Sequence, residues 1–302
     1  MMELRKLILM STSIVLALTL FQLKAEAETI EGNVLSVTPV IDAKSNQNEP
    51  SFFKLANKPG KQYTVRMIVE NMTNDEQRYV AEIQDANTND AGQIVYMEKT
   101  TKSGVRQFVK NKRFDGTIGP KQSEIVSFKV KLPKSQVDKR THLGGVIVME
   151  KPKSDVQHSI SNQFKIATSL TIADGATETN KLDSIQINKM VVGKNGLQTG
   201  YWMTVKNTSN KIINHVSYQI RVNRQVLNNH AGENGVMTLI PNETARIFVS
   251  TSQTTARLKD AKLILQKDQN RRTIDYKPKA LVRKTHQNIF SKFVNSLESL
   301  QI

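Results

Sequence analysis

Short stretches in which apolar and polar residues alternate, each ended by a polar turn, restrict the fold of this chain more than any other feature. Gln62–Val69 places every second residue on one apolar face, and Tyr79–Ile83 alternates in the same way. Gly145–Met149 is a continuous apolar run, which is typical of a strand buried on both faces. Helical periodicity is absent between residues 28 and 276. The pattern predicts an all-β protein.

The strand-rich sequence divides into two blocks. Residues 173–180 are small and polar without apolar periodicity, as expected of a linker. The strand-to-turn sequence at 69–74 is echoed at 205–210, and a proline turn that precedes a strand at Pro120 is echoed at Pro241. Short strands with such turns are typical of sandwiches, so we predict two tandem immunoglobulin-like β-sandwich domains, with one large sandwich as the alternative. The predicted domains span residues 28–175 and 181–276.

The first residues have the pattern of a secretory signal peptide. A positive start is followed by the apolar run Leu7–Leu23, and Ala25 and Ala27 are the small residues of a cleavage site. We predict removal of residues 1–27, with cleavage after Ala27 and Ala25 as the other candidate. The alternative is a retained membrane anchor, but the apolar run is shorter than the about 20 residues that a spanning helix needs.

Composition limits the chemistry of the exported chain. It has no cysteine, which excludes a disulfide scaffold, a thiolate metal site and a cysteine nucleophile. The formal net charge is +16, and the predicted signal peptide, with three basic and two acidic residues, carries only +1 of it. Such a surface favours anionic partners, here wall teichoic acids, peptidoglycan carboxylates or anionic lipid head groups, and no nucleic acid is expected. The alternative is that the charge only provides solubility.

No motif for catalysis or cofactor binding is present. The five histidines lack metal-ligand spacing, and there is no serine-hydrolase elbow and no phosphate-binding glycine loop. We predict no catalytic residue, no metal and no cofactor, with a distant carboxylate pair of a glycan hydrolase as the open alternative. Residues 85–92 begin like a calcium loop, but Asp90 stands where the turn glycine belongs and Tyr96 where the bidentate glutamate belongs. We interpret them as an Asx-rich loop, with a nonstandard calcium site as the alternative.

Exposure arguments give six candidate binding residues. Strand alternation turns Trp202, the only tryptophan, outward together with Lys206, and Arg66 takes the analogous position in the first block. The alternative is that a neighbouring strand or loop covers Trp202. A basic and aromatic cluster in a predicted loop supplies the other four residues, with a solvated loop and a core phenylalanine as the alternative. They are Phe108, Lys110, Lys112 and Arg113.

The tail, residues 277–302, has apolar residues at helical spacing from Ile289 to Leu300. This spacing predicts a short C-terminal amphipathic helix, which suits peripheral contact with an anionic membrane or docking into a partner groove. A helix packed on its own domain or a frayed end is the alternative.

Several segments together form a family pattern that covers nearly all of the predicted mature chain and is stronger in the first block. They are Val-Thr-Pro-Val at 37–40, Phe-Phe-Lys-Leu at 52–55, Lys-Pro-Gly-Lys at 58–61, the turn sequence at 69–74, the loop at 86–96, Ile-Gly-Pro at 118–120 and Leu-Gly-Gly-Val at 143–146. The pattern resembles the WxL-interacting proteins of Gram-positive cell surfaces, which are built from the domain types DUF916 and DUF3324.

The resemblance implies a non-enzymatic binding protein of the cell wall. It implies that the DUF916-like block at 28–175 binds peptidoglycan and that the DUF3324-like block at 181–276 retains WxL-domain proteins at the surface. Members of the family usually end in a transmembrane helix and a basic tail, so the amphipathic end of this sequence leads us to expect a wall-associated or truncated product. Three other functions stay open: binding of host matrix proteins, a chaperone that completes a partner's sheet, and a glycan-active enzyme.

Overall fold

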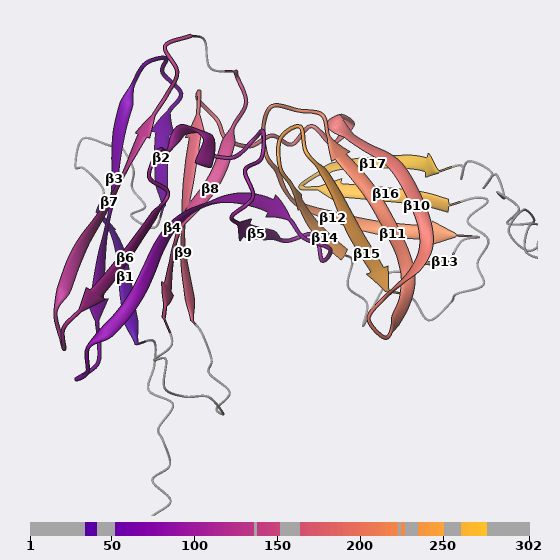
Figure 1. Cartoon of the computed structure of the whole chain (residues 1–302). Helices are drawn as coiled ribbons and strands as arrows, with labels where there is room; N and C mark the ends of the chain where they lie inside the picture. Colours follow the sequence, from indigo (N-terminus) through magenta and orange to yellow (C-terminus); the bar gives the residue numbers. More distant parts are fainter. Residues whose placement is uncertain are drawn as a thin grey trace, which may run out of the picture. The chain divides into compact units, whose positions relative to one another are not determined.

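The computed structural model is built from strands (Figure 1). In the residues that it describes, the only other regular structure is two short 3-10 turns, which confirms the predicted all-β class. The chain divides by its contacts into Met1–Val34 and Leu35–Ile302, and the strands of the described residues all belong to the second unit. The described part contains no helix that is long and apolar enough to cross a membrane. The described residues are 34–40, 52–135, 138–151, 164–222, 225–226, 235–250 and 261–276.

Two regions about which the sequence makes predictions lie outside the described residues. They are the predicted signal peptide, with its cleavage residues Ala25 and Ala27, and the predicted amphipathic helix of residues 277–302. Both stay predictions.

Strands β1–β9 form two sheets around one hydrophobic core, and we call this part the first sandwich. In the three-stranded sheet, β3 lies between β1 and β7. In the six-stranded sheet the order is β2-β9-β8-β4-β5, and β6 pairs with the first half of β4. The elements are β1 (Leu35–Val40), β2 (Phe53–Ala56), β3 (Gln62–Asn71), β4 (Gln77–Thr88), β5 (Ile94–Met97), η1 (Arg106–Phe108), β6 (Arg113–Ile118), β7 (Ser123–Lys131), β8 (His142–Glu150) and β9 (Lys165–Ala173).

Strands β10–β17 form two further sheets around a second core, and we call this part the second sandwich. In the three-stranded sheet, β11 lies between β10 and β15. In the five-stranded sheet the order is β13-β12-β16-β17, and β14 also pairs with β12. The elements are η2 (Leu182–Ser184), β10 (Ile185–Asn195), β11 (Gln198–Asn207), β12 (Ile213–Val222), β13 (Gln225–Val226), β14 (Gly235–Leu239), β15 (Thr244–Ser250), β16 (Ala261–Lys267) and β17 (Asn270–Tyr276).

The alternation in the sequence matches an alternation of burial on β3, whereas Tyr79–Ile83 on β4, which also alternates in the sequence, is buried throughout. On β3, Val65, Met67 and Val69 are buried in the core of the first sandwich, while Arg66 between them is exposed and Ile68 is half-buried. Strand β8 is buried along most of its length, as its continuous apolar run indicates. No strand of β1–β9 pairs with a strand of β10–β17. The domain boundaries and the immunoglobulin-like topology stay predictions.

The first echo between the two blocks has one geometry in both sandwiches. Asn71 is fully buried, and its side-chain amide donates hydrogen bonds to the carbonyls of Asp75, Ile118 and Gly119. Its Oδ1 accepts from the backbone N–H and the hydroxyl of Thr73. Asn71 therefore links the end of β3 to the turn that follows it and to the loop that follows β6.

Asn207 repeats this arrangement in the second sandwich. It is also fully buried, donates to the carbonyls of Lys211 and Leu239, and accepts from the N–H and hydroxyl of Ser209. Burial of both amides supports the interpretation of these Asn-x-Ser/Thr sequences as turn sequences.

The second echo also has one geometry. The residues that follow the two prolines, Lys121 and Asn242, both adopt positive φ angles, of 56° and 54°. Their N–H groups donate to the carbonyls of Thr73 and Ser209, which belong to the asparagine turns. The proline turn and the asparagine turn therefore form one unit that occurs once in each sandwich.

Candidate functional site

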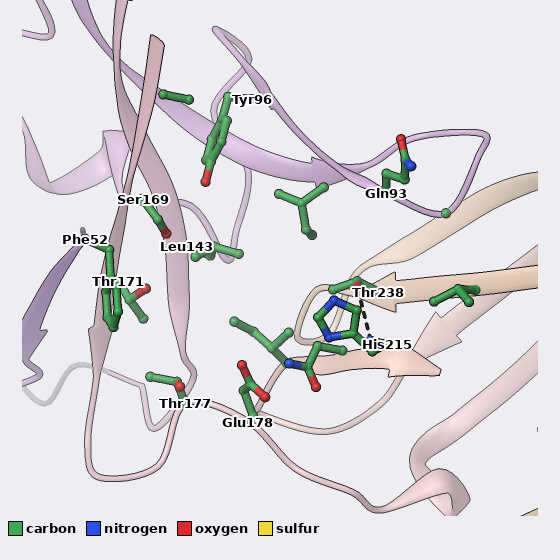
Figure 2. Close-up of a pocket in the computed structure, with 16 residues that line it drawn as sticks. Phe52, Gln93, Tyr96, Leu143, Ser169, Thr171, Thr177, Glu178, His215 and Thr238 are labelled. Atoms are coloured by element: carbon green, nitrogen blue, oxygen red, sulfur yellow. Dashed lines mark hydrogen bonds between the residues drawn. The ribbon is translucent and has the colours of Figure 1, made fainter. Parts of the chain in front are cut away.

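A groove of about 840 Å³ is the larger of two candidate sites, and Figure 2 shows the residues that line it. Part of its lining comes from the face of the six-stranded sheet that is turned away from the core. This face carries Tyr96 on β5, Leu143 on β8, and Ser169 and Thr171 on β9. In Figure 2, Ser169, Thr171 and Phe52 lie together on one side of the groove, with Tyr96 above them.

The opposite side of the groove carries His215 and Thr238, with Glu178 below (Figure 2). His215 has a positive φ of 49° and lies where the pairing of β12 with β14 is irregular, between Ile213 and Val216. Its N–H donates to the hydroxyl of Thr238 at 3.2 Å. Such an irregularity changes the direction of a side chain, so it contributes to the exposure of His215 here.

The ring of Tyr96 lies against the sheet because a glycine makes room for it. A Cβ atom at Gly145 would approach Tyr96 Cε1 to 2.9 Å, closer than real side chains come. Tyr96 and Phe52 are both half-buried, so each presents part of a ring to the groove. Ring faces combined with hydroxyl groups suit a ligand with both apolar and polar surfaces, such as a glycan or a peptide.

The described residues that line the groove do not include the carboxylate pair of a glycan hydrolase. Glu178 is the only carboxylate among its lining residues, whereas that chemistry uses two. The described residues also contain no group of three or more His, Cys, Asp or Glu side chains that could hold a metal ion. The arrangement is suited to binding.

The Asx-rich segment that resembles a calcium loop is used for structure. Asp85 is fully buried, and its carboxylate accepts the N–H groups of Thr101 and Arg106, each at 2.8 Å. Burial raises the pKa of Asp85 above its ordinary value. Further along, Asn89 Oδ1 accepts the N–H groups of Ala91 and Gln93. The first residue of the supposed calcium series therefore holds a neighbouring loop, which supports the Asx-loop interpretation.

A second groove, of about 520 Å³, contains three of the predicted binding residues. Phe108, Lys110 and Lys112 line it, together with Lys129 and Lys131 of β7. We call it the lysine groove. Phe108 is buried in the core of the first sandwich. This agrees with the alternative given above, in which the phenylalanine of the cluster belongs to the core. Gln62, Gln107 and Val109 complete the lining.

Arg113, the fourth residue of the predicted cluster, does not line the lysine groove. Its guanidinium pairs with Asp115 at 3.0 Å and with Glu82 at 3.4 Å. The hydrogen bonds of Arg113 and Lys151 lower the pKa of Asp115 to about 2. Arg113 thus forms part of an ion-pair network at the surface of β6.

Trp202 is half-buried on the outward face of the sheet β10-β11-β15. The guanidinium of Arg246 lies 4.2 Å from the centre of its ring, and the Phe248 ring lies 5.0 Å away. Its Nε1 donates to the carbonyl of Lys194 at 3.1 Å. Trp202 is therefore neither fully covered nor a free contact residue, because an exposed arginine stacks on it. Arg66 is exposed on β3, as predicted from alternation.

Sequence reasoning about exposure did not select Tyr96 and Phe52 as site residues. A signal was present, since both lie in the segments at 52–55 and 86–96 that carry the family resemblance. Phe52 reaches the groove because the strand that follows it, β2, pairs with β9. These two strands are far apart in the sequence but adjacent in the sheet, so local sequence could not indicate this contact.

Comparisons with solved structures find chaperones at low similarity. The YadV chaperone is 10% identical, with a TM-score of 0.38, over 81% of this chain and 100% of that chain. The E. coli chaperone DraB is 11% identical, with a TM-score of 0.33, over 81% and 100% of the two chains. The CsuC–CsuE chaperone–tip subunit complex of Acinetobacter baumannii is 11% identical, with a TM-score of 0.36, over 71% and 89%. Such low scores carry no argument about function.

Comparison with protein families gives a direct match for the first sandwich. No curated protein matches the sequence. One family model matches residues 35–150, and its description is "WxL Interacting Protein, peptidoglycan binding domain". The matched segment begins with β1 and ends with β8, and it contributes Phe52, Tyr96 and Leu143 to the larger groove. Residues 35–150 therefore belong to the family of peptidoglycan-binding domains of WxL-interacting proteins.

Proposed function

We propose that this protein is a non-enzymatic adaptor of the Gram-positive cell wall, which binds peptidoglycan through the first sandwich and retains WxL-domain proteins through the second. The observation that carries the proposal is the match of residues 35–150 to a peptidoglycan-binding domain. A domain of this kind implies association with the cell wall. The signal sequence predicted at residues 1–27 agrees with that location.

The larger groove is our candidate for the peptidoglycan contact. Peptidoglycan has sugar rings with apolar faces, and it has hydroxyl and amide groups along the glycan and the stem peptides. Tyr96 and Phe52 offer ring faces to such a polymer, and Ser169, Thr171 and Thr238 offer hydroxyl groups. The presence of a single carboxylate, Glu178, supports binding without cleavage.

The outward face around Trp202 is our candidate for the WxL-domain contact. Trp202 and Phe248 are cross-strand neighbours on β11 and β15, and Val191 on β10 is the partner of Trp202 on its other side. The three side chains form one row across the sheet, with Arg246 stacked on the tryptophan. Tryptophan and arginine are the residue types that dominate the binding energy of protein interfaces.

One experiment with two partners tests both halves of the proposal. The chain from residue 28 onward is prepared as the unaltered protein, as the double variant Phe52→Ala/Tyr96→Ala, and as Trp202→Ala. Each is sedimented with purified peptidoglycan and captured on an immobilised WxL-domain protein. We expect the groove variant to bind peptidoglycan about tenfold more weakly and WxL protein normally, and Trp202→Ala to show the reverse.

Each variant is the control for the other, because a misfolded protein would fail with both partners. If the unaltered chain binds neither partner, the adaptor function is wrong, and binding of host matrix proteins becomes the next function to test. If it binds both and neither variant differs, the function stands and the two surfaces are wrong.

A further inference from the structure

The lysine groove concentrates positive charge at one end of the three-stranded sheet of the first sandwich. Lys129 and Lys131 occupy alternate, outward positions on β7 and are both exposed. An antiparallel bridge between Val109 and Val130 brings the segment with Lys110 beside this strand. In antiparallel pairing the residue after Val109 lies opposite the residue before Val130, so Lys110 lies beside Lys129.

This pairing is unfavourable by itself. Like charges that lie opposite each other on neighbouring strands destabilise a sheet. Strand β3, on the other side of β7, offers no negative charge to offset this repulsion, because Lys129 pairs with Thr64 and Lys131 pairs with Gln62. No aspartate or glutamate is among the described residues that line the groove. In the described part of the chain, no ion pair involves the side chain of any of its four lysines.

The acidic residues of the same sheet are far from the groove. The outward acidic residue of β3 is Glu70, eight positions from Gln62, or about 26 Å along the strand. Glu124 of β7 accepts a hydrogen bond from the Tyr79 hydroxyl at 2.8 Å, so it is engaged elsewhere. The two acidic residues of β3 and β7 therefore lie away from the end of the sheet that carries Lys129 and Lys131.

The spacing of the lysines favours a repeating anion. Lys129 and Lys131 are two residues apart on one strand, which separates them by about 6.6 Å. Lys110 and Lys112 are likewise two residues apart on the adjoining segment, and Lys112 is held in place by a hydrogen bond from the Ile83 N–H to its carbonyl at 2.8 Å. Two short rows of ammonium groups suit a flexible polymer with one negative charge in each short repeat.

We propose that the lysine groove binds the phosphodiester backbone of an anionic wall polymer, a polyol-phosphate chain of the teichoic acid kind. Lysine ammonium groups are effective phosphate ligands that act as point charges and do not need a fixed approach direction. Phe108 and Val109 also line the groove, but both are buried in the core of the first sandwich, so the exposed lysines provide most of its contact surface. This inference concerns a second ligand and a different surface, so it goes beyond the peptidoglycan contact proposed above.

The test compares two variants of equal charge. The lysine-groove variant is Lys110→Gln/Lys112→Gln/Lys129→Gln/Lys131→Gln. The control removes four exposed lysines elsewhere. Its substitutions are Lys99→Gln, Lys165→Gln, Lys189→Gln and Lys194→Gln. Thermal unfolding verifies that both variants fold.

Binding of a purified poly(glycerol phosphate) is measured at several salt concentrations. We expect the groove variant to bind at least about tenfold more weakly than the unaltered chain and to show a shallower salt dependence, because fewer counter-ions are released. The control variant should change far less. Equal losses in both variants, or no loss in the groove variant, would overturn the proposal.

Three further arms separate the sources of negative charge. Poly-glutamate carries carboxylates in place of phosphates, and vesicles of equimolar phosphatidylglycerol and phosphatidylcholine carry the phosphate on a lipid. Equal binding to either probe, with the same dependence on the four lysines, would overturn the assignment to a wall polymer. Peptidoglycan stripped of its phosphate polymers should bind the groove variant normally, and a loss there would assign the lysines to the peptidoglycan contact instead.

Discussion

Asn71 and Asn207 are the single residues that tie together the most backbone in each sandwich. Each satisfies several carbonyl and N–H groups that would otherwise be buried without partners. A buried polar group that loses its partner costs about 1–3 kcal/mol, which explains why an amide with both a donor and an acceptor end occupies each position.

Replacement of either asparagine by alanine should therefore destabilise the protein strongly. We expect Asn71→Ala to lower the free energy of unfolding by about 2 kcal/mol or more, and Asn207→Ala to do the same in the second sandwich. Urea denaturation followed by circular dichroism measures the change. Asn74→Ala, at an exposed position of the same turn, is the matched control and should stay within about 0.5 kcal/mol of the unaltered protein. An equally small effect of Asn71→Ala would show that its hydrogen bonds do not matter for stability.

At the scale of one element, the start of β8 contains a buried histidine. The His142 side chain is only 2% exposed, and its ring meets the Phe108 ring edge-on, with 4.8 Å between the centres. Burial lowers the pKa of His142, while the nearby Asp138 acts in the opposite direction and Arg140 in the same direction as burial. Its Nε2 lies 3.3 Å from Asp138 Oδ1, without the geometry of a hydrogen bond.

This histidine should make the first sandwich sensitive to acid. A lowered pKa in the folded state means that the unfolded chain takes up the proton first. The contribution to stability is complete above the unfolded pKa of 6.5 and is lost as the pH falls below it. We expect the free energy of unfolding to fall between about pH 7.5 and about pH 5.5, where histidine titrates, and His142→Gln to reduce that fall. His215→Gln, the same substitution at an exposed histidine, is the control. A fall of equal size in the His142 variant would assign the effect to other groups.

At the scale of the whole molecule, one glycine sets a close approach between the two sandwiches, which lie in the same compact unit. Gly92 has a φ of +80°, and its carbonyl accepts the N–H of Thr238 at 2.8 Å. A Cβ atom at Gly92 would lie 2.9 Å from the carbonyl oxygen of Val236 and 3.0 Å from the Cβ atom of Met237. The Asx-rich loop before this glycine thus serves to place backbone against β14.

The free energy of unfolding that is lost when the close contact at Gly92 is disrupted can be separated from the part that is lost through backbone strain. Gly92→Ala and Gly196→Ala both place alanine at a positive φ, but at Gly196 nothing lies within 4 Å of the new methyl group. We expect Gly196→Ala to cost about 1–2 kcal/mol of strain, and Gly92→Ala to cost more, because the methyl group also displaces β14. Thermal unfolding measured by calorimetry gives both values. Equal losses would show that the contact at Gly92 adds nothing.

Most of the elements could be predicted, and part of the site. Alternation on β3 correctly predicts that Arg66 is exposed, because the side-chain period of a strand is a local property. Of the cluster predicted around Phe108, the structure brings Lys110 and Lys112 to one groove, whereas Arg113 pairs with Glu82, which is remote in sequence. The role of these residues in binding stays a prediction. The packing of the Tyr96 ring over Gly145 could not be predicted from the local sequence, because the two residues are far apart in the chain.

By itself the sequence determined the strands, the two repeated asparagine turns, the excess of positive charge and the resemblance of the first block to a peptidoglycan-binding family. These properties depend on residue type and on spacing over a few positions. Only the tertiary structure decided which strands are neighbours. That choice places Lys110 beside Lys129, sets Arg246 on Trp202, and brings Phe52 and Tyr96 to one groove. The physical reason is that sheet pairing joins residues far apart in the chain through backbone hydrogen bonds, which are the same for every side chain.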